Sequence, residues 1–226
     1  MFEAILAQVP LFSHLPDDSL SHLASKLLRR RFERDQIIFH KNDPGSTLYI
    51  IISGKVKIVM PSADGENVLV ALLSTGDFFG ELSLFDGEPR SATAISAEST
   101  EILTLDQKDL FSYLAEHSQA AVEILGELSL RLRRTDELLS DAAFCNLPSR
   151  LSKRLLELAA RYGQPEESGD IRINMRLKQQ DLADMVGATR ESVNKTLKSY
   201  KQKEMITVEK GYITIRDLTG LQFKAR

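Results

Sequence analysis

The stretch "FFGELSLFDGEPRSATA", Phe78 to Ala94, places two charged residues in an otherwise apolar, small-residue, strand-like run. Burying Glu81 and Arg90 is unfavourable unless each finds a partner, because a buried charge loses its hydration. Two arrangements meet this need: a direct Glu81–Arg90 salt bridge, or a polar ligand held between the two side chains. A guanidinium suits a phosphate well, and Gly80 allows the backbone to approach closely.

On both sides of this stretch, from Arg31 to about Leu105, short β-branched runs alternate with turn signals. The turns are Asp43-Pro44-Gly45 and Asp64-Gly65, whose residue types favour tight reversals of the chain. Strands this short and evenly spaced predict a β sandwich, roll or barrel. Residues 1–30 predict short helices, with Asp17 or Asp18 as a cap and Leu20, Leu23, Leu27 and Leu28 at helical spacing.

From about Ser118 the hydrophobic period becomes that of a long helix. A narrow seam steps by four and three residues in turn, with Arg131, Arg133 and Arg134 beside it. The seam is typical of a two-stranded coiled coil, so we predict a homodimer. Its members are Ala121, Leu125, Leu128, Leu132, Leu139 and Ala142, with Thr135 as a polar interruption. The alternative is a helix that packs on its own β domain.

The long helix is expected to end at Asn146-Leu147-Pro148, because Asn caps a new helix well and Pro is tolerated in its first turn. We therefore predict a hinge over 144–148. The expected domains are a β domain with N-terminal helices over 1–117, a dimerisation helix over 118–145 and a third domain over 146–226. Within the third domain, 163–170 is expected to be a polar loop and 171–177 a strand-like run.

The segment "LKQQDLADMVGATRESVNKTLKSY", residues 177–200, predicts two short helices with a tight turn between them. Gly187 permits the turn and Thr189 is a good cap for the second helix. Leu182, Ala183 and Val186 form the apolar face of the first helix, and Val193 and Leu197 form that of the second. This is the pattern of a helix-turn-helix, whose second helix enters the DNA major groove. Residues 205–217 then predict a β-hairpin wing around Lys210-Gly211.

The exposed face of the second helix carries side chains suited to reading bases. Arg190 can donate two hydrogen bonds to guanine, and Glu191 can accept one from cytosine. Lys195 can contact a guanine or a phosphate. The remaining candidates are Asn194 on the same face and Gln179, Gln180, Thr189 and Lys198, which we expect to contact the DNA backbone. The alternative is an amphipathic helical pair with a solvated charged face.

Charge is distributed unevenly along the 226 residues, whose net charge is −3. Residues 1–146 carry 13 basic and 22 acidic side chains, whereas residues 147–226 carry 16 and 10. A basic C-terminal domain favours a polyanionic partner. The single cysteine, the missing signal-peptide pattern and the lack of a long apolar run predict a cytoplasmic protein without a membrane partner.

Catalysis and metal binding are not expected. A metal site in a β-roll would need clustered His and Glu, but of the four histidines, His14, His22, His40 and His117, only His40 lies in a predicted β segment. No Ser-His-Asp or Gly-x-Ser-x-Gly pattern occurs. A single cysteine cannot hold an iron–sulfur cluster within one chain. These patterns favour a binding protein over an enzyme.

The cassette "GELSLFDGEPRSATA" resembles the phosphate-binding cassette of the cyclic-AMP receptor protein (CRP/FNR) family, and "GATRESVNKTL" resembles that family's recognition helix. The resemblance implies an α+β fold: a cyclic-nucleotide-binding β-roll (jelly roll), a long dimerisation helix and a C-terminal winged helix-turn-helix. It also implies a bacterial, allosteric transcription regulator that binds double-stranded DNA at TGTGA-like palindromes, with RNA polymerase as a further partner.

By the same resemblance, Glu81 would accept a hydrogen bond from the ribose 2′-OH, and Arg90 and Ser91 would bind the cyclic phosphate. Backbone amides near Gly80 and Ala92 would assist, and Leu82 belongs to the same site. Thr135 and Asp136 of the partner chain would contact the base. The resemblance makes cyclic AMP the expected ligand. Because Asp136 stands where the family often has a hydroxyl or an amide, cyclic GMP stays open. The alternatives are another small effector, or DNA binding that needs no ligand.

Overall fold

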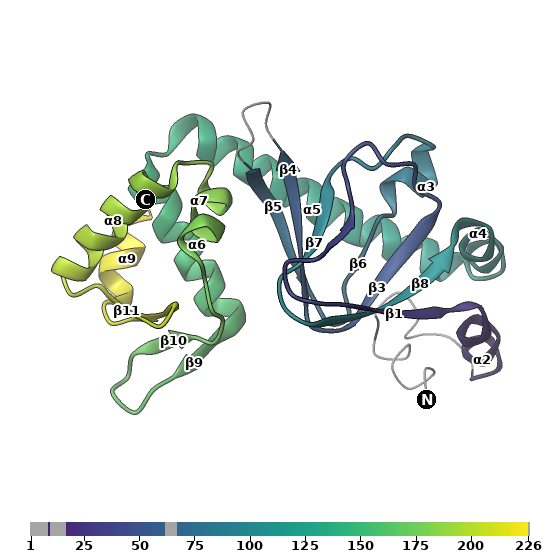
Figure 1. The fold of residues 1–226 in the computed structure, drawn as a ribbon, viewed down its shortest axis with the longest axis horizontal. Coiled ribbons are helices and arrows are strands. Elements are labelled where there is room, and N and C mark those ends of the chain that lie inside the picture. The colour runs from purple at the N-terminus through teal and green to yellow at the C-terminus, as the bar shows by residue number, and fades with distance from the viewer. Residues whose placement is uncertain (1–8, 10–16, 62–66, 226) are drawn as a thin grey trace. The chain divides into compact units, whose positions relative to one another are not determined.

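The computed structural model describes Val9 and residues 17–61 and 67–225 (Figure 1). These residues form two compact units, and the division falls within the long helix α5 (Ser118–Phe144), between Arg134 and Thr135. The first unit is β-rich, with helices at its edge, and the second is mainly helical. The expected α+β class is therefore confirmed.

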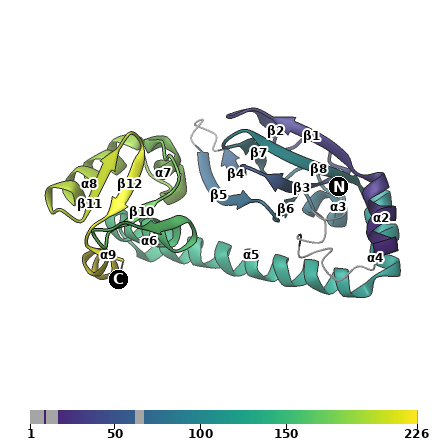
Figure 2. The same cartoon turned by 90° about the horizontal axis from the view of Figure 1, so that it is seen from below.

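The first unit is a roll of two four-stranded sheets that face each other (Figure 2). One sheet has the order β1 (Leu28–Phe32), β8 (Thr100–Asp106), β3 (Thr47–Ser53) and β6 (Phe78–Phe79). The other has the order β2 (Ile37–Phe39), β7 (Thr93–Ser96), β4 (Lys55–Pro61) and β5 (Asn67–Ser74). The expected hairpin turn at Asp64-Gly65 lies outside the described residues.

Strand β3 shows why its sequence is almost continuously apolar. Its side chains alternate between two cores: Leu48 and Ile50 face the helices α2 (Asp17–Lys26), α4 (Gln107–Glu116) and α5, whereas Ile51 faces the second sheet. Because both faces of this strand are covered, an alternating polar pattern would bury unsatisfied groups.

Two sequence expectations in this unit are wrong. Leu28 does not continue the helix, because α2 ends at Lys26 and Leu28 begins strand β1 with its side chain exposed. The run from Phe78 to Ala94 is not strand-like throughout. Between β6 and β7 it forms the one-turn helix α3 (Leu82–Asp86), which ends at Gly87 with a left-handed φ of 73°. Leu82 and Phe85 point partly to solvent, so the apolar run does not form a core strand.

In the second unit the end of α5 is followed by α6 (Leu147–Tyr162), whose N-cap Asn146 accepts a hydrogen bond from the backbone N–H of Ser149, as the sequence predicts. A four-stranded sheet has the order β11 (Ile206–Glu209), β12 (Tyr212–Ile215), β10 (Ile171–Ile173) and β9 (Gly163–Pro165). The segment 163–170 therefore starts as a strand rather than a polar loop. The hairpin β11–β12 is the expected wing, and α9 (Leu218–Lys224) ends the described chain.

Helix α5 combines two surfaces. Ala120 and Ile124 are buried in the core of the roll, and Leu128 packs partly against it. Leu125, Leu132 and Leu139, spaced by seven residues, are 63%, 63% and 70% exposed. The helix thus packs on its own roll and also carries an exposed apolar row. Among the described residues, no helix has the length and apolarity needed to cross a membrane.

Candidate functional site

Arg90 lies in the turn just before strand β7, which pairs with β2. Its backbone N–H donates to the carbonyl of Asp43 at 2.8 Å, and its carbonyl accepts from the N–H of Asn42 at 2.8 Å. The side chain is only 3% exposed. Its Nη1 donates to the carbonyl of Gly80 at 2.6 Å, and its Nη2 donates to the carbonyl of Thr47 at 2.9 Å. Pairing of β6 with β3 brings these two carbonyls together.

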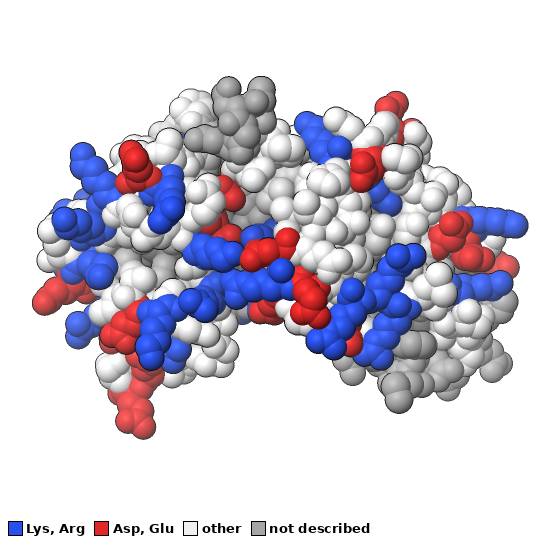
Figure 3. Space-filling view, viewed as in Figure 1, with Lys and Arg blue, Asp and Glu red and all other residues white. Residues whose placement is uncertain are grey.

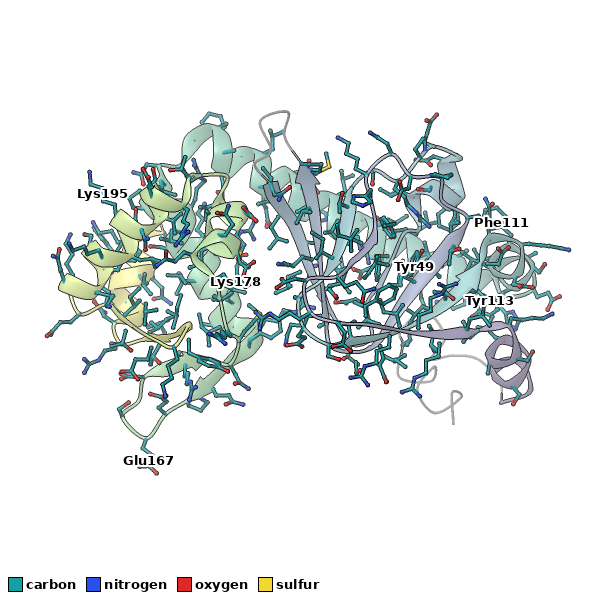
Figure 4. All side chains as sticks on the ribbon, viewed as in Figure 1. Tyr49, Phe111, Tyr113, Glu167, Lys178 and Lys195 are labelled. Atoms are coloured by element: carbon teal, nitrogen blue, oxygen red, sulfur yellow. The ribbon has the colours of Figure 1, made fainter. Side chains whose placement is uncertain are left out.

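Aromatic rings and glycines shape the slot around this guanidinium. Its carbon lies 4.5 Å from the ring centre of Phe39 and 5.4 Å from that of Tyr49 (Figure 4, where Tyr49 is labelled). A Cβ at Gly45 would lie 2.5 Å from Cζ of Arg90, and one at Gly80 would lie 2.7 Å from its Nη1. Gly80 also has a φ of 82°, which side chains rarely adopt. Both positions therefore require glycine while Arg90 lies in this slot.

The charge of Arg90 is incompletely compensated. Burial lowers the pKa of Arg90, and Tyr49, Glu81 and Asp43 offset part of this effect. Its Nε is buried and has no hydrogen-bond partner within the described part of the chain. A buried N–H without an acceptor costs about 1–3 kcal/mol. The slot therefore has the chemistry of an anion site, since an oxyanion would supply both a charge and an acceptor.

The carboxylate of Glu81 pairs with Arg131 rather than with Arg90. It is 4% exposed, and its carboxylate accepts from Nη1 of Arg131 on α5 at 2.8 Å. Nη2 of Arg131 also donates to the carbonyl of Phe78 at 2.5 Å. No ion pair joins Glu81 to Arg90 in the residues that the structure covers, so the direct salt bridge is not formed. The sequence places Arg131 beside the seam but gives no sign of this contact.

The other candidate ligand residues fall into two groups. Gly80 and Glu81 lie beside Arg90, with Leu82 44% exposed at the start of α3, Ser91 exposed and Ala92 buried in the adjoining loop. Thr135 and Asp136 lie on the part of α5 that belongs to the second unit, and both are exposed. Of the first group, Gly80 bonds to the guanidinium of Arg90 through its carbonyl.

The second candidate site is the face of α8 (Arg190–Gln202), which follows α7 (Gln179–Val186). Gly187 has a left-handed φ of 57°, and the hydroxyl of Thr189 accepts from the backbone N–H of Ser192, as the sequence predicts. Val193 and Leu197 are buried. The opposite face is exposed and carries Arg190, Glu191, Asn194, Lys195 and Lys198.

Gln179 has a role that sequence reasoning missed. Its side-chain oxygen accepts from Nδ2 of Asn194 at 2.7 Å and from Nε of Arg190 at 3.3 Å. It therefore orients two candidate base-reading side chains. Gln180 is bonded within its own helix, through its amide to Asp184 at 2.8 Å.

Basic side chains gather on this part of the molecule. Figure 3 shows Lys and Arg side chains over α8, and in Figure 4 Lys195 points away from the protein at the outer edge of that helix. Lys178 stands at the N-cap of α7. A basic face around an exposed recognition helix is the electrostatic footprint of a DNA-binding surface.

Comparison with known families matches both units. Residues 29–117 match the cyclic nucleotide-binding domain, and residues 149–223 match the Crp-like helix-turn-helix domain. A CRP-like cAMP-activated global transcriptional regulator of Mycobacterium tuberculosis is 36% identical, over 99% of this chain and 100% of the relative. A global nitrogen regulator of Synechocystis is 32% identical, over 84% of this chain and 85% of the relative.

Solved structures share the fold. The c-di-GMP responsive global regulator of Xanthomonas campestris superposes with a TM-score of 0.77 and 23% identity, covering 88% of this chain and 99% of that one. The names of these proteins give different effectors, cAMP for the first and c-di-GMP for the last, so the shared architecture is compatible with more than one ligand.

Proposed function

Because this chain belongs to the CRP/FNR family of transcription regulators, we propose that it is a homodimeric DNA-binding regulator controlled by a cyclic nucleotide, with cyclic AMP as the ligand. The observation that carries the ligand class is Arg90: a buried cation whose Nε finds no acceptor among the residues described, in a slot walled by Gly45 and Gly80. A cyclic phosphate supplies the missing acceptor and charge.

Each residue of the cassette has a distinct task in this proposal. Arg90 binds the phosphate with Nε, while its two terminal nitrogens stay on the carbonyls of Gly80 and Thr47. The exposed hydroxyl of Ser91 and the amides near Gly80 and Ala92 add hydrogen bonds. Leu82 offers an apolar contact. Glu81 accepts from the ribose 2′-OH and keeps Arg131 as its partner, because a carboxylate has lone pairs for both.

Arg131 gives the site a connection to α5 within the same unit. Ligand that binds Glu81 adds to the bonds that Arg131 makes to Glu81 and Phe78, and so acts on the long helix. Thr135 and Asp136 of the partner chain then contact the base. The ligand must bind one of two arrangements of the long helices more tightly than the other, since equal affinity for both would leave the equilibrium between them unchanged.

DNA binding is assigned to the second unit. Arg190 and Glu191 read base edges, and Asn194 and Lys195 contact neighbouring groups. Gln179 orients Arg190 by accepting a hydrogen bond from its Nε. Gln180, Thr189 and Lys198 contact the backbone. We place the domains at 1–117, 118–145 and 146–226, with the dimer formed through Ala121, Leu125, Leu128, Leu132, Leu139 and Ala142. The protein would act in the cytoplasm on TGTGA-like palindromes, with RNA polymerase as a further partner.

The test is fluorescence anisotropy of a labelled TGTGA-type palindrome, titrated with protein at one fixed salt concentration, because phosphate contacts make affinity strongly salt-dependent. Three titrations are compared: without nucleotide, with cyclic AMP and with cyclic GMP. We expect tighter binding with cyclic AMP, and no gain in Arg90→Lys, because a compact ammonium lacks the rigid planar spread of donors that reaches two carbonyls and a phosphate at once. Tight binding that ignores both nucleotides would leave the DNA-binding assignment and refute the ligand.

A further inference from the structure

The connection between α5 and α6 is bridged by one arginine. Helix α5 ends at Phe144, and Cys145 leads into the N-cap Asn146 of α6. From the first turn of α6, Nη1 of Arg150 donates to the carbonyl of Cys145 at 2.8 Å. Carbonyls at a helix C-terminus lack intrahelical partners, so this bond satisfies a group that the end of α5 leaves open.

The other side of the same guanidinium reaches the helix-turn-helix. Nε of Arg150 donates to the carbonyl of Val186 at 3.0 Å. Val186 is the last residue of α7, directly before the turn at Gly187 that sets the direction of α8. One positive charge therefore lies at the C-terminal ends of two helices, where helix dipoles favour a cation.

Two neighbouring contacts extend this bridge. Nζ of Lys153 pairs with the carboxylate of Asp141 on the last turn of α5 at 2.5 Å. The buried hydroxyl of Tyr200 on α8 donates to the carbonyl of Pro148 at 2.7 Å and lies 2.8 Å from the hydroxyl of Ser152. Helix α6 is thus bonded to the end of α5 on one side and to α7 and α8 on the other.

We propose that Arg150 is a positioning residue for DNA binding: it fixes the recognition helix α8 relative to the C-terminal end of α5, and so sets the half-site spacing that a dimer accepts. Arg150 would thus act on the placement of the two recognition helices in a dimer. The measurement with nucleotide described below rests on the function proposed above. A rigid, planar guanidinium is needed, because its fixed donors can hold two carbonyls at once, whereas a lysine offers one point charge.

Arg154 provides a matched control. It lies one turn further along α6, and its Nε donates to the carbonyl of Met185 at 3.4 Å, while its Nη1 pairs with Glu157. Arg154 therefore contacts the same end of α7 but makes no bond to the end of α5 among the described residues. Arg150 joins the two helix ends and Arg154 does not, so the variants R150Q and R154Q separate the bridge from a simple contact with α7.

The experiment measures the affinity of the full chain for three palindromes: the preferred spacing, one base pair more and one base pair less. Adding one base pair moves a half-site by about 3.4 Å and rotates it by about 35°. We expect the wild type and R154Q to lose affinity by about 10-fold or more for either altered spacing, and R150Q to lose about 3-fold or less. R150Q should bind nucleotide as the wild type does, since Arg150 lies outside the cassette.

Equal spacing discrimination in R150Q and the wild type would overturn the proposal, and so would an equal loss of discrimination in R154Q. If R150Q unfolds the second unit, as amide hydrogen exchange of α7 and α8 would reveal, R150K replaces it, with the same reduced discrimination expected. The nucleotide-induced gain in affinity is measured alongside and should shrink in R150Q. If nucleotide does not change the DNA affinity of the wild type, the proposed ligand response is refuted. The comparison of half-site spacings still decides the role of Arg150.

Discussion

Because Glu81 and Arg131 form a buried ion pair, we predict that removing Arg131 lowers the stability of the first unit. The test variant is Arg131→Met, which keeps much of the aliphatic stem and removes the charge. The Glu81 side chain is 5% exposed and that of Arg131 is 21% exposed, with 2.8 Å between Oε1 and Nη1. Removing Arg131 leaves a buried carboxylate without its charge partner.

The expected cost follows from this burial. Breaking a fully buried ion pair costs about 3–5 kcal/mol, and water that reaches the partly exposed Arg131 position brings the expectation to about 3 kcal/mol. Arg131 also donates to the carbonyl of Phe78, so the loss is not due to Glu81 alone. The double variant with Glu81→Gln isolates the pair: its cost should fall short of the sum of the single costs by about 2 kcal/mol.

Amide hydrogen exchange in β3 and β8 measures this cost within the full chain, because both strands lie in the core of the first unit. An opening free energy lower by 3 kcal/mol speeds exchange by about 100-fold. Arg133→Met, an exposed position on the same helix, is the control and should change exchange little. Two results would refute the assignment of Arg131 as the partner of Glu81. One is that the costs of Arg131→Met and Glu81→Gln simply add in the double variant, and the other is that Arg133→Met speeds exchange as much as Arg131→Met.

Three further predictions concern the slot, the DNA face and the dimer. Gly45→Ala should lower nucleotide affinity by about 10-fold or more by calorimetry, since its Cβ would lie 2.5 Å from Cζ of Arg90; unchanged affinity would contradict the slot. Glu191→Ala should relax specificity at one base pair by about 1–3 kcal/mol, whereas equal weakening for all sequences would exclude base reading. Leu132→Ser, at a 63% exposed seam position, should shift sedimentation towards monomer at low concentration, while Leu130→Ser, 52% exposed but off the seam, should not; equal profiles would count against the seam.

The helix-turn-helix could be predicted closely because its determinants are local. The turn depends on Gly187, the cap on Thr189 and the buried face on apolar residues one turn apart, all within a short segment. The cassette was harder to predict. A pattern of apolar and small residues suggested a strand from Phe78 to Ala94, yet the chain turns through α3, because the end of β6 and the left-handed Gly87 redirect it. The leucines Leu125, Leu132 and Leu139 of the predicted seam are exposed, but the partial packing of Leu128 on the roll depends on which side of α5 meets the β domain.

The sequence by itself determined the strands of the roll, the long helix, the break at Asn146 and the helix-turn-helix, since periodicity, caps and turns act over a few residues. Only the tertiary structure decided which side chains meet. Glu81 pairs with an arginine 50 residues away, Arg90 donates to a carbonyl 43 residues away, and Arg150 joins the ends of two helices. The physical reason is that such contacts depend on strand pairing and helix packing, which place distant segments together and leave each buried charge to bond with the groups that the fold brings within reach.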